Sequence, residues 1–290
     1  MLSRPEFTLM SKAQFAELHQ RHVKLGEGAM TRVYLAWQDD QQQIAYKVYM
    51  CKNGAAEESY WHEIMALEHL ESRGFLHAVR LLSYCPTKAT ISMSYCPDPT
   101  LARVIIETGV FSPRHAWGLF LALFRVVDQL HGAGVAHHDL KPENIMYNRL
   151  TQRVTLVDFG FATLIQHRLE RRCQRAMTPF YAPTEAMDYH EEGHILTHVD
   201  WYGMAMTVYA CIHGDVAFGA AKTRMELRHL RANAPDKMPP ITVDLPIGFA
   251  LLLRQMLHDS VTYRPTVPIL RRKVEKLIVD MGDGTSMMTV

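Results

Sequence analysis

The chain has 290 residues, of which 48% are hydrophobic and 21% are charged, the balance of an ordinary globular protein. Its 31 Lys and Arg match its 30 Asp and Glu, so no net charge favours nucleic acid or an anionic membrane as a partner. The five cysteines contain no CxxC pair, which argues against a zinc site or disulfide framework and favours a reducing compartment. Because we find no apolar run of signal-peptide or membrane-spanning length, we expect a soluble intracellular protein of the cytoplasm or nucleus.

The first third of the chain has the pattern of short strands. Five runs rich in Val, Ile, Tyr and Thr are bounded by turn residues and predict strands at 22–28, 32–38, 44–50, 79–85 and 90–96. One helix interrupts them, because apolar residues recur at helical spacing from Glu57 to Leu70.

The pattern changes near residue 95, and helical spacing dominates after residue 100. An apolar stripe runs from Ala116 to Leu130, directly after the helix-start signal Ser112–Pro113. A further helix is predicted from Pro246, and a basic amphipathic helix from Ile269 to Asp280. The sequence therefore predicts an α+β protein, with a small β-rich part followed by a larger helical part.

The strongest chemical motif is His-His-Asp-Leu-Lys-Pro-Glu-Asn at 137–144, followed by Asp-Phe-Gly at 158–160. Phosphoryl transfer needs little more than a positioned nucleophile and cations on the phosphates. Asp139 can accept the proton of a substrate hydroxyl, and Lys141 can neutralise charge on the transferring group. Asn144 and Asp158 supply the oxygen ligands that Mg²⁺ prefers. The motif predicts a phosphotransferase that uses ATP and Mg²⁺.

These motifs resemble those of the eukaryotic-type protein kinases, and Lys-Pro-Glu after Asp139 resembles the Ser/Thr branch. The resemblance implies a bilobal protein-kinase fold, with a small β-rich N-lobe carrying one helix and a larger, mainly helical C-lobe. It places the kinase domain at 20–275, divided into an N-lobe (about 20–94), a hinge (94–98) and a C-lobe (about 99–275). The ends form an N-terminal extension (1–19) and a short C-terminal tail (276–290).

The glycine-rich loop of the family is matched by Leu25-Gly26-Glu27-Gly28 and the residues up to Val33, although Thr31 replaces the third glycine. We expect this replacement to stiffen the loop and to weaken ATP binding without abolishing it. Lys47, in Ile-Ala-Tyr-Lys, resembles the strand lysine that contacts the α- and β-phosphates. Glu57, Glu58 and Glu63 are all candidate partners for it, and Glu63 is the best, because it lies beside the apolar stripe of its helix.

The resemblance also implies an adenine pocket. Met93 takes the gatekeeper position, and Ser94, Tyr95 and Cys96 offer backbone hydrogen bonds. The base lies between Val33, Ala45 and Met146. The residues expected to bind the nucleotide are therefore Leu25, Gly26, Gly28, Val33, Ala45, Lys47, Met93, Ser94, Tyr95, Cys96 and Met146.

Downstream motifs fit the same family. The run from Thr178 to Glu185 resembles the loop that receives a peptide substrate, and Arg264 is the expected partner of Glu185. Asp200, in Asp-Trp-Tyr-Gly, resembles the helix residue that anchors the catalytic loop. The resemblance therefore extends over about 20 to 275.

Two departures bear on regulation. His138 stands where most of the family has an arginine that receives the activation-segment phosphate. The segment from Leu164 to Met177 contains no Ser, Thr or Tyr. Our hypothesis is a kinase that is active without phosphorylation of this segment. The segment is also basic (Arg168, Arg171, Arg172, Arg175), which indicates either a solvated face or a docking surface for acidic substrates, and its Cys173 is an oxidisable thiol among arginines.

The sequence as a whole favours a Ser/Thr protein kinase that phosphorylates protein hydroxyls, with Asp139, Lys141, Lys47 and Glu63 as the catalytic set. Two alternatives are a pseudokinase that acts as a binding module and a kinase-fold enzyme that phosphorylates small molecules. The first usually loses Lys47, Asp139 or Asp158, and the second typically lacks the Thr178–Glu185 loop. Short, divergent kinases of this kind resemble those of large DNA viruses and intracellular bacteria, which would place the protein in a host cell.

Overall fold

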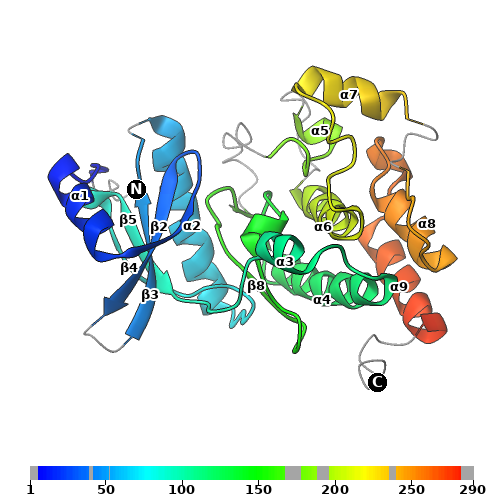
Figure 1. Cartoon of the computed structure of the whole chain (residues 1–290), viewed down its shortest axis with the longest axis horizontal. Helices are drawn as coiled ribbons and strands as arrows, with labels where there is room; N and C mark the ends of the chain where they lie inside the picture. Colours follow the sequence, from blue (N-terminus) through cyan, green and yellow to red (C-terminus); the bar gives the residue numbers. More distant parts are fainter. Residues whose placement is uncertain are drawn as a thin grey trace. The chain divides into compact units, whose positions relative to one another are not determined.

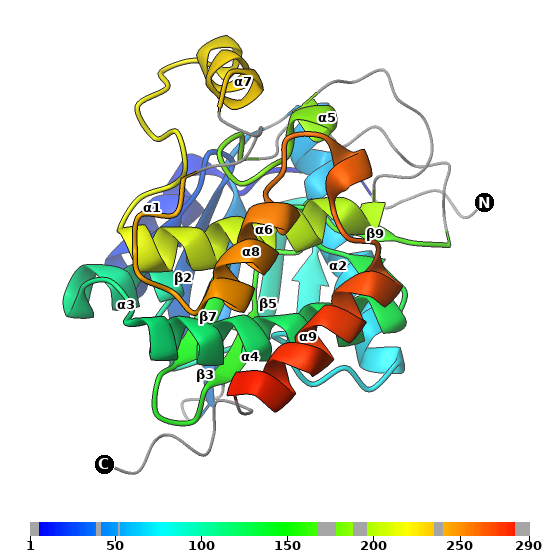
Figure 2. The same ribbon diagram turned by 90° about the vertical axis from the view of Figure 1, so that its right-hand side faces the viewer.

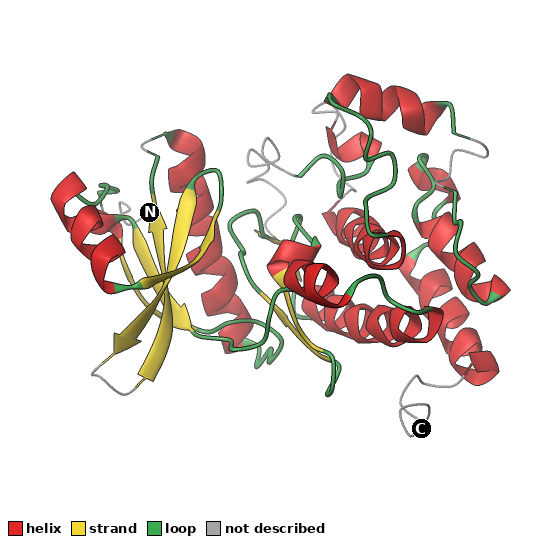
Figure 3. Ribbon diagram, viewed as in Figure 1, coloured by secondary structure: helices red, strands yellow, loops and turns green. Residues whose placement is uncertain are grey.

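The computed structural model describes residues 6–38, 42–51, 53–166, 178–187, 196–234 and 240–281. The chain divides into two compact units. The first unit comprises Met1–Asp98 and the returning segment Thr155–Ala162, and the second comprises Pro99–Val154 and Thr163–Val290. Strands dominate the first unit and helices dominate the second, as the colouring in Figure 3 shows.

An antiparallel sheet forms the centre of the first unit, with the strand order β1-β2-β3-β5-β4. Its strands are β1 (Val23–Glu27), β2 (Thr31–Gln38), β3 (Gln42–Tyr49), β4 (Leu81–Cys85) and β5 (Thr90–Ser94), with the short helix η1 (Pro86–Lys88) between the last two. All five strands match the runs read from the sequence. In the central part of the sheet, Lys47 pairs with Val33 on one side and Ile91 on the other.

Helices lie on both sides of this sheet (Figure 1). The helix α2 (Gly54–Ser72) lies on one side, and its first turn is capped by the Asn53 side chain, which accepts a hydrogen bond from the Ala56 N–H. On the other side lies α1 (Lys12–Arg21), whose Phe15 and His19 rings contact the buried Tyr34 of β2. The described helix at the end of the expected N-terminal extension thus packs on the sheet.

The second unit is built mainly from helices. They are α3 (Leu101–Thr108), α4 (Pro113–Gly132), α5 (Thr184–Met187), α6 (Leu196–His213), α7 (Arg224–Ala232), α8 (Ile247–Met256) and α9 (Val267–Met281), with the short helices η2 (Pro142–Asn144) and η5 (Val261–Tyr263). Helix α6 packs against α4 and α8, and α8 packs against α9 (Figure 2). Every residue of α6 from 199 to 212 is buried, as expected for a helix that is apolar on all faces.

Short strands form in the part of the chain that connects α4 to α5. They are β6 (Val135–Ala136), β7 (Ile145–Asn148), β8 (Arg153–Leu156) and β9 (Thr163–Leu164). β6 pairs with β9, and β7 pairs with β8. Within β8, from Thr155 on, the chain returns to the first unit, where the Leu156 N–H donates to the His77 carbonyl at 2.7 Å. This return places Asp158 in the same unit as Lys47.

The observed architecture confirms the predicted α+β fold, with a small β-rich part and a larger helical part. Within the described residues, no helix combines the length and the apolar composition needed to cross a membrane. The predicted helix at Glu57–Leu70 extends from Gly54 to Ser72, and the last predicted helix from Val267 to Met281. Of the activation segment, residues 167–177 lie outside the described part of the chain, so Cys173 and the four arginines of that segment do too.

Candidate active site

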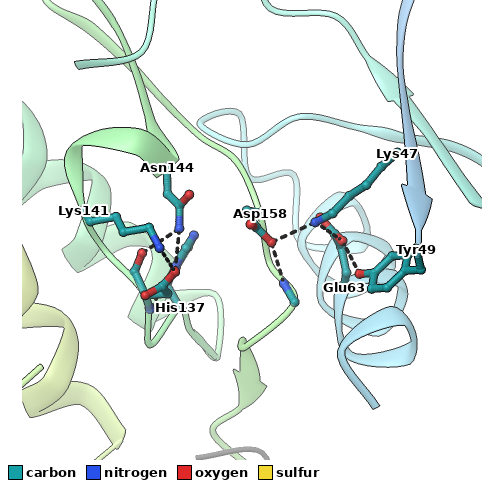
Figure 4. Close-up of polar contacts among 9 residues, drawn as sticks. Lys47, Tyr49, Glu63, His137, Lys141, Asn144 and Asp158 are labelled. Carbon is teal, nitrogen blue, oxygen red and sulfur yellow. Dashed lines mark hydrogen bonds and ion pairs between the residues drawn. The ribbon is translucent and has the colours of Figure 1, made fainter. Parts of the chain in front are cut away.

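A buried ion-pair cluster lies in the first unit, around Lys47. Its Nζ lies 2.6 Å from Glu63 Oε2 and 2.8 Å from Asp158 Oδ1 (Figure 4). The side chain of Lys47 is 3% exposed and that of Glu63 is 0% exposed, whereas that of Asp158 is 38% exposed. Of the three glutamates weighed from the sequence, Glu63 is therefore the one that contacts Lys47.

Burial and charge act in opposite directions on Lys47. Burial by itself would lower the pKa of the ammonium, but the nearby charges of Asp158 and Glu63 raise that pKa well above its usual value. The lysine therefore keeps its charge at every working pH. A fixed cation beside an accessible carboxylate is suited to holding phosphate oxygens.

Asp158 has a left-handed backbone, with φ of 63°. Such a conformation is uncommon for residues other than glycine, and Asp is among those that tolerate it best. Its Oδ1 accepts from Lys47 and, at 3.4 Å, from the Gly160 N–H. These contacts hold one carboxylate oxygen, and the partial exposure of the side chain allows the group to meet a ligand.

A second polar cluster, centred on Asp139, lies in the second unit. Lys141 Nζ and Asn144 Nδ2 donate to Asp139 Oδ2 at 2.7 and 2.9 Å. Thr178 Oγ1 donates to Asp139 Oδ1 at 2.8 Å, and Lys141 Nζ also donates to Thr178 Oγ1 at 2.7 Å. Both carboxylate oxygens are therefore oriented by neighbouring donors, so the side chain is held in one position.

Asp200 of α6 anchors the loop that carries Asp139. Its Oδ2 accepts from the His137 N–H and its Oδ1 from the His138 N–H, at 2.8 and 2.7 Å, and His131 Nε2 lies 2.8 Å from Oδ2. Burial would raise the pKa of Asp200, but its hydrogen bond with His131 and the nearby histidines lower that pKa to about 2. The ionised carboxylate therefore fixes the loop's backbone over the working pH range.

Close packing supports this anchor. A Cβ atom on Gly203 of α6 would lie 3.0 Å from the Leu140 carbonyl oxygen and 3.3 Å from the Leu140 Cβ. A side chain at position 203 would therefore push α6 away from the loop that carries Asp139.

His138 is buried beside Asp139 and has a left-handed backbone, with φ of 66°. Its Nε2 lies 2.8 Å from the Thr163 hydroxyl of β9. The imidazole thus joins the 137–144 loop to Thr163, the first residue of β9.

The loop from Thr178 to Glu185 is held by two arginines. Arg264 makes a bidentate pair with Glu185, with Nη2 3.1 Å from Oε2. Arg231 of α7, which is 2% exposed, donates from Nη1 to the Ala182 carbonyl at 2.8 Å and from Nη2 to the Phe180 carbonyl at 3.1 Å. Both guanidinium groups lie over the Tyr202 ring.

Comparison with known families agrees with this geometry. A family model described as "Protein kinase domain" matches residues 19–274. The chain belongs to the protein kinase family.

Curated relatives of the kinase domain are mostly longer proteins. Sperm motility kinase 2A of Mus musculus is 24% identical over 271 residues, which cover 89% of this chain and 51% of the relative. The maternal embryonic leucine zipper kinase of Xenopus laevis is 25% identical over 263 residues, covering 88% and 38%. The calcium-dependent protein kinase SK5 of Glycine max is 26% identical over 179 residues, covering 59% and 35%. The chain thus spans about half or less of the length of these relatives.

The nucleotide residues expected from the sequence are divided between the two units. Within the kinase's first unit, Ala45 pairs across the sheet with Met93. The glycine-rich loop spans the β1–β2 turn, in which the Gly28 N–H donates to the Thr31 carbonyl at 2.8 Å. Thr31 pairs with Tyr49 as the first residue of β2, so its backbone is extended and does not require glycine. Met146 lies on β7, in the second unit.

At the expected hinge, Ser94 is hydrogen-bonded to Arg80. The Ser94 N–H donates to the Arg80 carbonyl at 2.9 Å, and the Ser94 hydroxyl accepts from the Arg80 N–H at 2.9 Å. Because β5 continues through Ser94, that N–H is used within the first unit. The expected contact of Ser94 with adenine would therefore use its carbonyl, and a backbone donor would come from Tyr95 or Cys96; these contacts stay a prediction.

The residues expected to hold Mg²⁺ have suitable donor chemistry. Asp158 offers a partly exposed carboxylate. Asn144 directs its Nδ2 at Asp139, and its amide oxygen points away from that contact (Figure 4). Among the described residues, no group of three or more His, Cys, Asp or Glu forms a metal site.

Sequence reasoning missed three contacting residues of this kinase. Tyr49 donates from its hydroxyl to Glu63 Oε2 at 2.8 Å, His131 contacts Asp200, and Arg231 contacts the Thr178–Glu185 loop. A local signal existed only for Tyr49, because strand alternation puts residues 47 and 49 on the same face. Nothing in the sequence near His131 or Arg231 indicates its partner, which lies 69 residues away for His131 and 49 for Arg231.

Proposed function

We propose that this chain is an ATP-dependent Ser/Thr protein kinase that transfers the γ-phosphate to hydroxyl groups of proteins. The observation that carries the proposal is the arrangement around Asp139, whose two carboxylate oxygens are oriented by Lys141, Asn144 and Thr178. This arrangement suits a base that must accept a proton from a hydroxyl in one fixed position.

In the second unit, Asp139 would orient the substrate hydroxyl and accept its proton as the new P–O bond forms and the bond from the γ-phosphorus to the β–γ bridging oxygen breaks, with ADP as the leaving group. Lys141, within 2.7 Å of both Asp139 and the Thr178 hydroxyl, would bring positive charge to the transferring group. Asp200 holds the backbone of the loop, so that the proton acceptor needs little reorganisation during the reaction.

In the first unit, Lys47 would hold the α- and β-phosphates, and Glu63 keeps the ammonium in place. Asp158 and Asn144 would be the protein ligands of Mg²⁺. When bound, Mg²⁺ neutralises charge on the phosphates and stabilises the leaving oxygen. Tyr95 or Cys96 would supply the backbone contact to adenine, beside Ala45 and Met93.

We further propose that the enzyme is active without phosphorylation of its activation segment. The family's phosphate-binding arginine is replaced by His138, which is buried and bonded to Thr163. A buried imidazole engaged with a neighbouring hydroxyl is a poor receptor for a phosphate. Phosphatase treatment of the purified protein should therefore leave its activity unchanged, and a loss of activity would contradict this part of the proposal.

The test of the proposed function is the transfer of radiolabelled phosphate from ATP onto generic protein substrates, with Asp139→Asn as the matched variant. We expect transfer to Ser and Thr, and a fall of about 10²–10⁴-fold in the variant. Equal activity in the variant would refute the role of Asp139. Nucleotide binding without transfer would indicate a pseudokinase, and transfer only to small molecules would indicate the third alternative.

A further inference from the structure

The buried carboxylate of Glu63 has two donors on one oxygen. Lys47 Nζ and the Tyr49 hydroxyl both contact Oε2, at 2.6 and 2.8 Å (Figure 4). Within the described part of the chain, Glu63 Oε1 is buried without a hydrogen-bond partner. The orientation of this carboxylate therefore depends on the two donors at Oε2.

Lys47 alone does not determine that orientation, because its ammonium is shared. It contacts Asp158 Oδ1 at 2.8 Å as well as Glu63. A flexible lysine that engages two carboxylates can move toward either one. The Tyr49 hydroxyl has no such freedom, because it stands at the end of a rigid ring on the same strand face as Lys47.

The ring of Tyr49 is fixed by its surroundings. It is 1% exposed and lies edge-on to Tyr60 of α2, with ring centroids 5.4 Å apart. Tyr60 in turn packs against Phe7 of the N-terminal segment, at 5.2 Å. Since burial and the charge of Glu63 raise the pKa of Tyr49 well above its usual value, the hydroxyl keeps its proton and remains a donor.

We propose that Tyr49 is a positioning residue for the Lys47–Glu63 pair: its hydroxyl fixes Glu63 Oε2, and through it the ammonium that would hold the ATP phosphates. The expected loss of kcat/KM rests on the proposed function, because it assumes that Lys47 holds the phosphates of ATP. The coupling between Tyr49 and Glu63 is independent of catalysis. If the Tyr49 ring only filled space in the core, a phenylalanine at this position would serve equally well.

The experiment compares Tyr49→Phe with Tyr60→Phe in the full chain. Tyr60 is the matched control, because its ring is equally buried and its hydroxyl donates to a neutral acceptor, the Thr90 carbonyl, at 3.4 Å. We expect Tyr49→Phe to reduce kcat/KM for ATP about 10-fold and to leave the KM for the protein substrate unchanged, the loss typical of a hydrogen bond to a charged group. Tyr60→Phe should remain close to wild type. Equal losses in the two variants would overturn the proposal.

A double-mutant cycle separates positioning from packing. ATP affinity and the free energy of unfolding are measured for Tyr49→Phe, Glu63→Gln and the double variant. We expect Tyr49→Phe to have little further effect when Glu63 is already replaced, because the two residues act as a unit. Additive effects would refute the proposal. If the wild type transfers no phosphate, the proposed function fails, but the cycle still tests the role of Tyr49 through affinity and stability.

Discussion

The two polar clusters of this kinase, one in each unit, are built on different principles. The Lys47 cluster joins side chains that are 16 and 111 residues apart in the chain, and its central pair is almost fully buried. The Asp139 cluster joins residues 2 and 5 apart, with Thr178 added from 39 residues away, and the side chain of Lys141 is 21% exposed.

This difference indicates which cluster supports the fold. A buried ion pair that loses one partner leaves an uncompensated charge in a low-dielectric interior, which is costly. Asp139 is 3% exposed, but it keeps Asn144 and Thr178 as donors when Lys141 is lost, and the partly exposed Lys141 position is open to water. Stability should therefore depend on the Lys47 cluster, and the Asp139 cluster should mainly affect catalysis.

The strongest test of this comparison replaces the lysine of each cluster. Lys47→Met should lower the free energy of unfolding by about 3 kcal/mol, because it strands the buried Glu63 carboxylate. Lys141→Met should cost much less stability, although both variants lose activity. Urea unfolding measures both changes. The double variant Lys47→Met/Glu63→Gln should recover part of the loss, and equal destabilisation by the two single lysine variants would contradict the comparison.

The second prediction concerns Arg231, a buried charge of the second unit. Arg231→Met removes the donors to the Ala182 and Phe180 carbonyls. Because a buried carbonyl left unpaired, such as that of Ala182, costs about 1–3 kcal/mol, the Thr178–Glu185 loop should lose its fixed shape. Steady-state kinetics should show a KM for the protein substrate raised about 10-fold, with the KM for ATP unchanged. If the KM for ATP rises equally, the effect is not confined to this loop.

The third prediction uses the lowered pKa of Asp200, about 2 against an ordinary 3.8. Since the folded-state pKa is depressed, the ionised group stabilises the fold above about pH 4, and that contribution is lost as the pH falls through 2. The difference corresponds to about 2 kcal/mol.

His131→Gln provides the comparison for this third prediction, because it removes one cause of the shift. Unfolding free energies measured between pH 5 and pH 2 should fall more steeply with acid in the wild type than in the variant. Identical slopes would show that His131 does not stabilise the carboxylate.

The smallest expected effect on stability is that of Thr178→Val, which removes the hydroxyl shared by Asp139 and Lys141. Its kcat should fall about 10-fold, whereas the free energy of unfolding should change by less than about 1 kcal/mol. Thr178→Ser, which keeps the hydroxyl, should restore most of the kcat. A large loss of stability would place Thr178 among the structural residues and would weaken the contrast between the clusters.

Much of the fold could be predicted from local patterns. All five strands of the sheet and helices α2, α4, α8 and α9 follow from alternation, helical spacing and caps such as Ser112 before Pro113. Details that depend on neighbours could not be predicted. The use of the Ser94 N–H within the sheet is one such detail, because it depends on Arg80, which lies 14 residues away.

The sequence by itself was enough to predict the Asp139 loop, Lys47 and Asp158 as candidate site residues. Their motifs are short, and the residue types in them carry the chemistry. Only the tertiary structure decided that Thr155–Ala162 returns to the first unit and brings Asp158 to Lys47. It also placed Tyr49, His131 and Arg231 against their partners. The physical reason is that periodicity shows which face of an element is buried, whereas contacts between distant segments depend on how all the elements pack together.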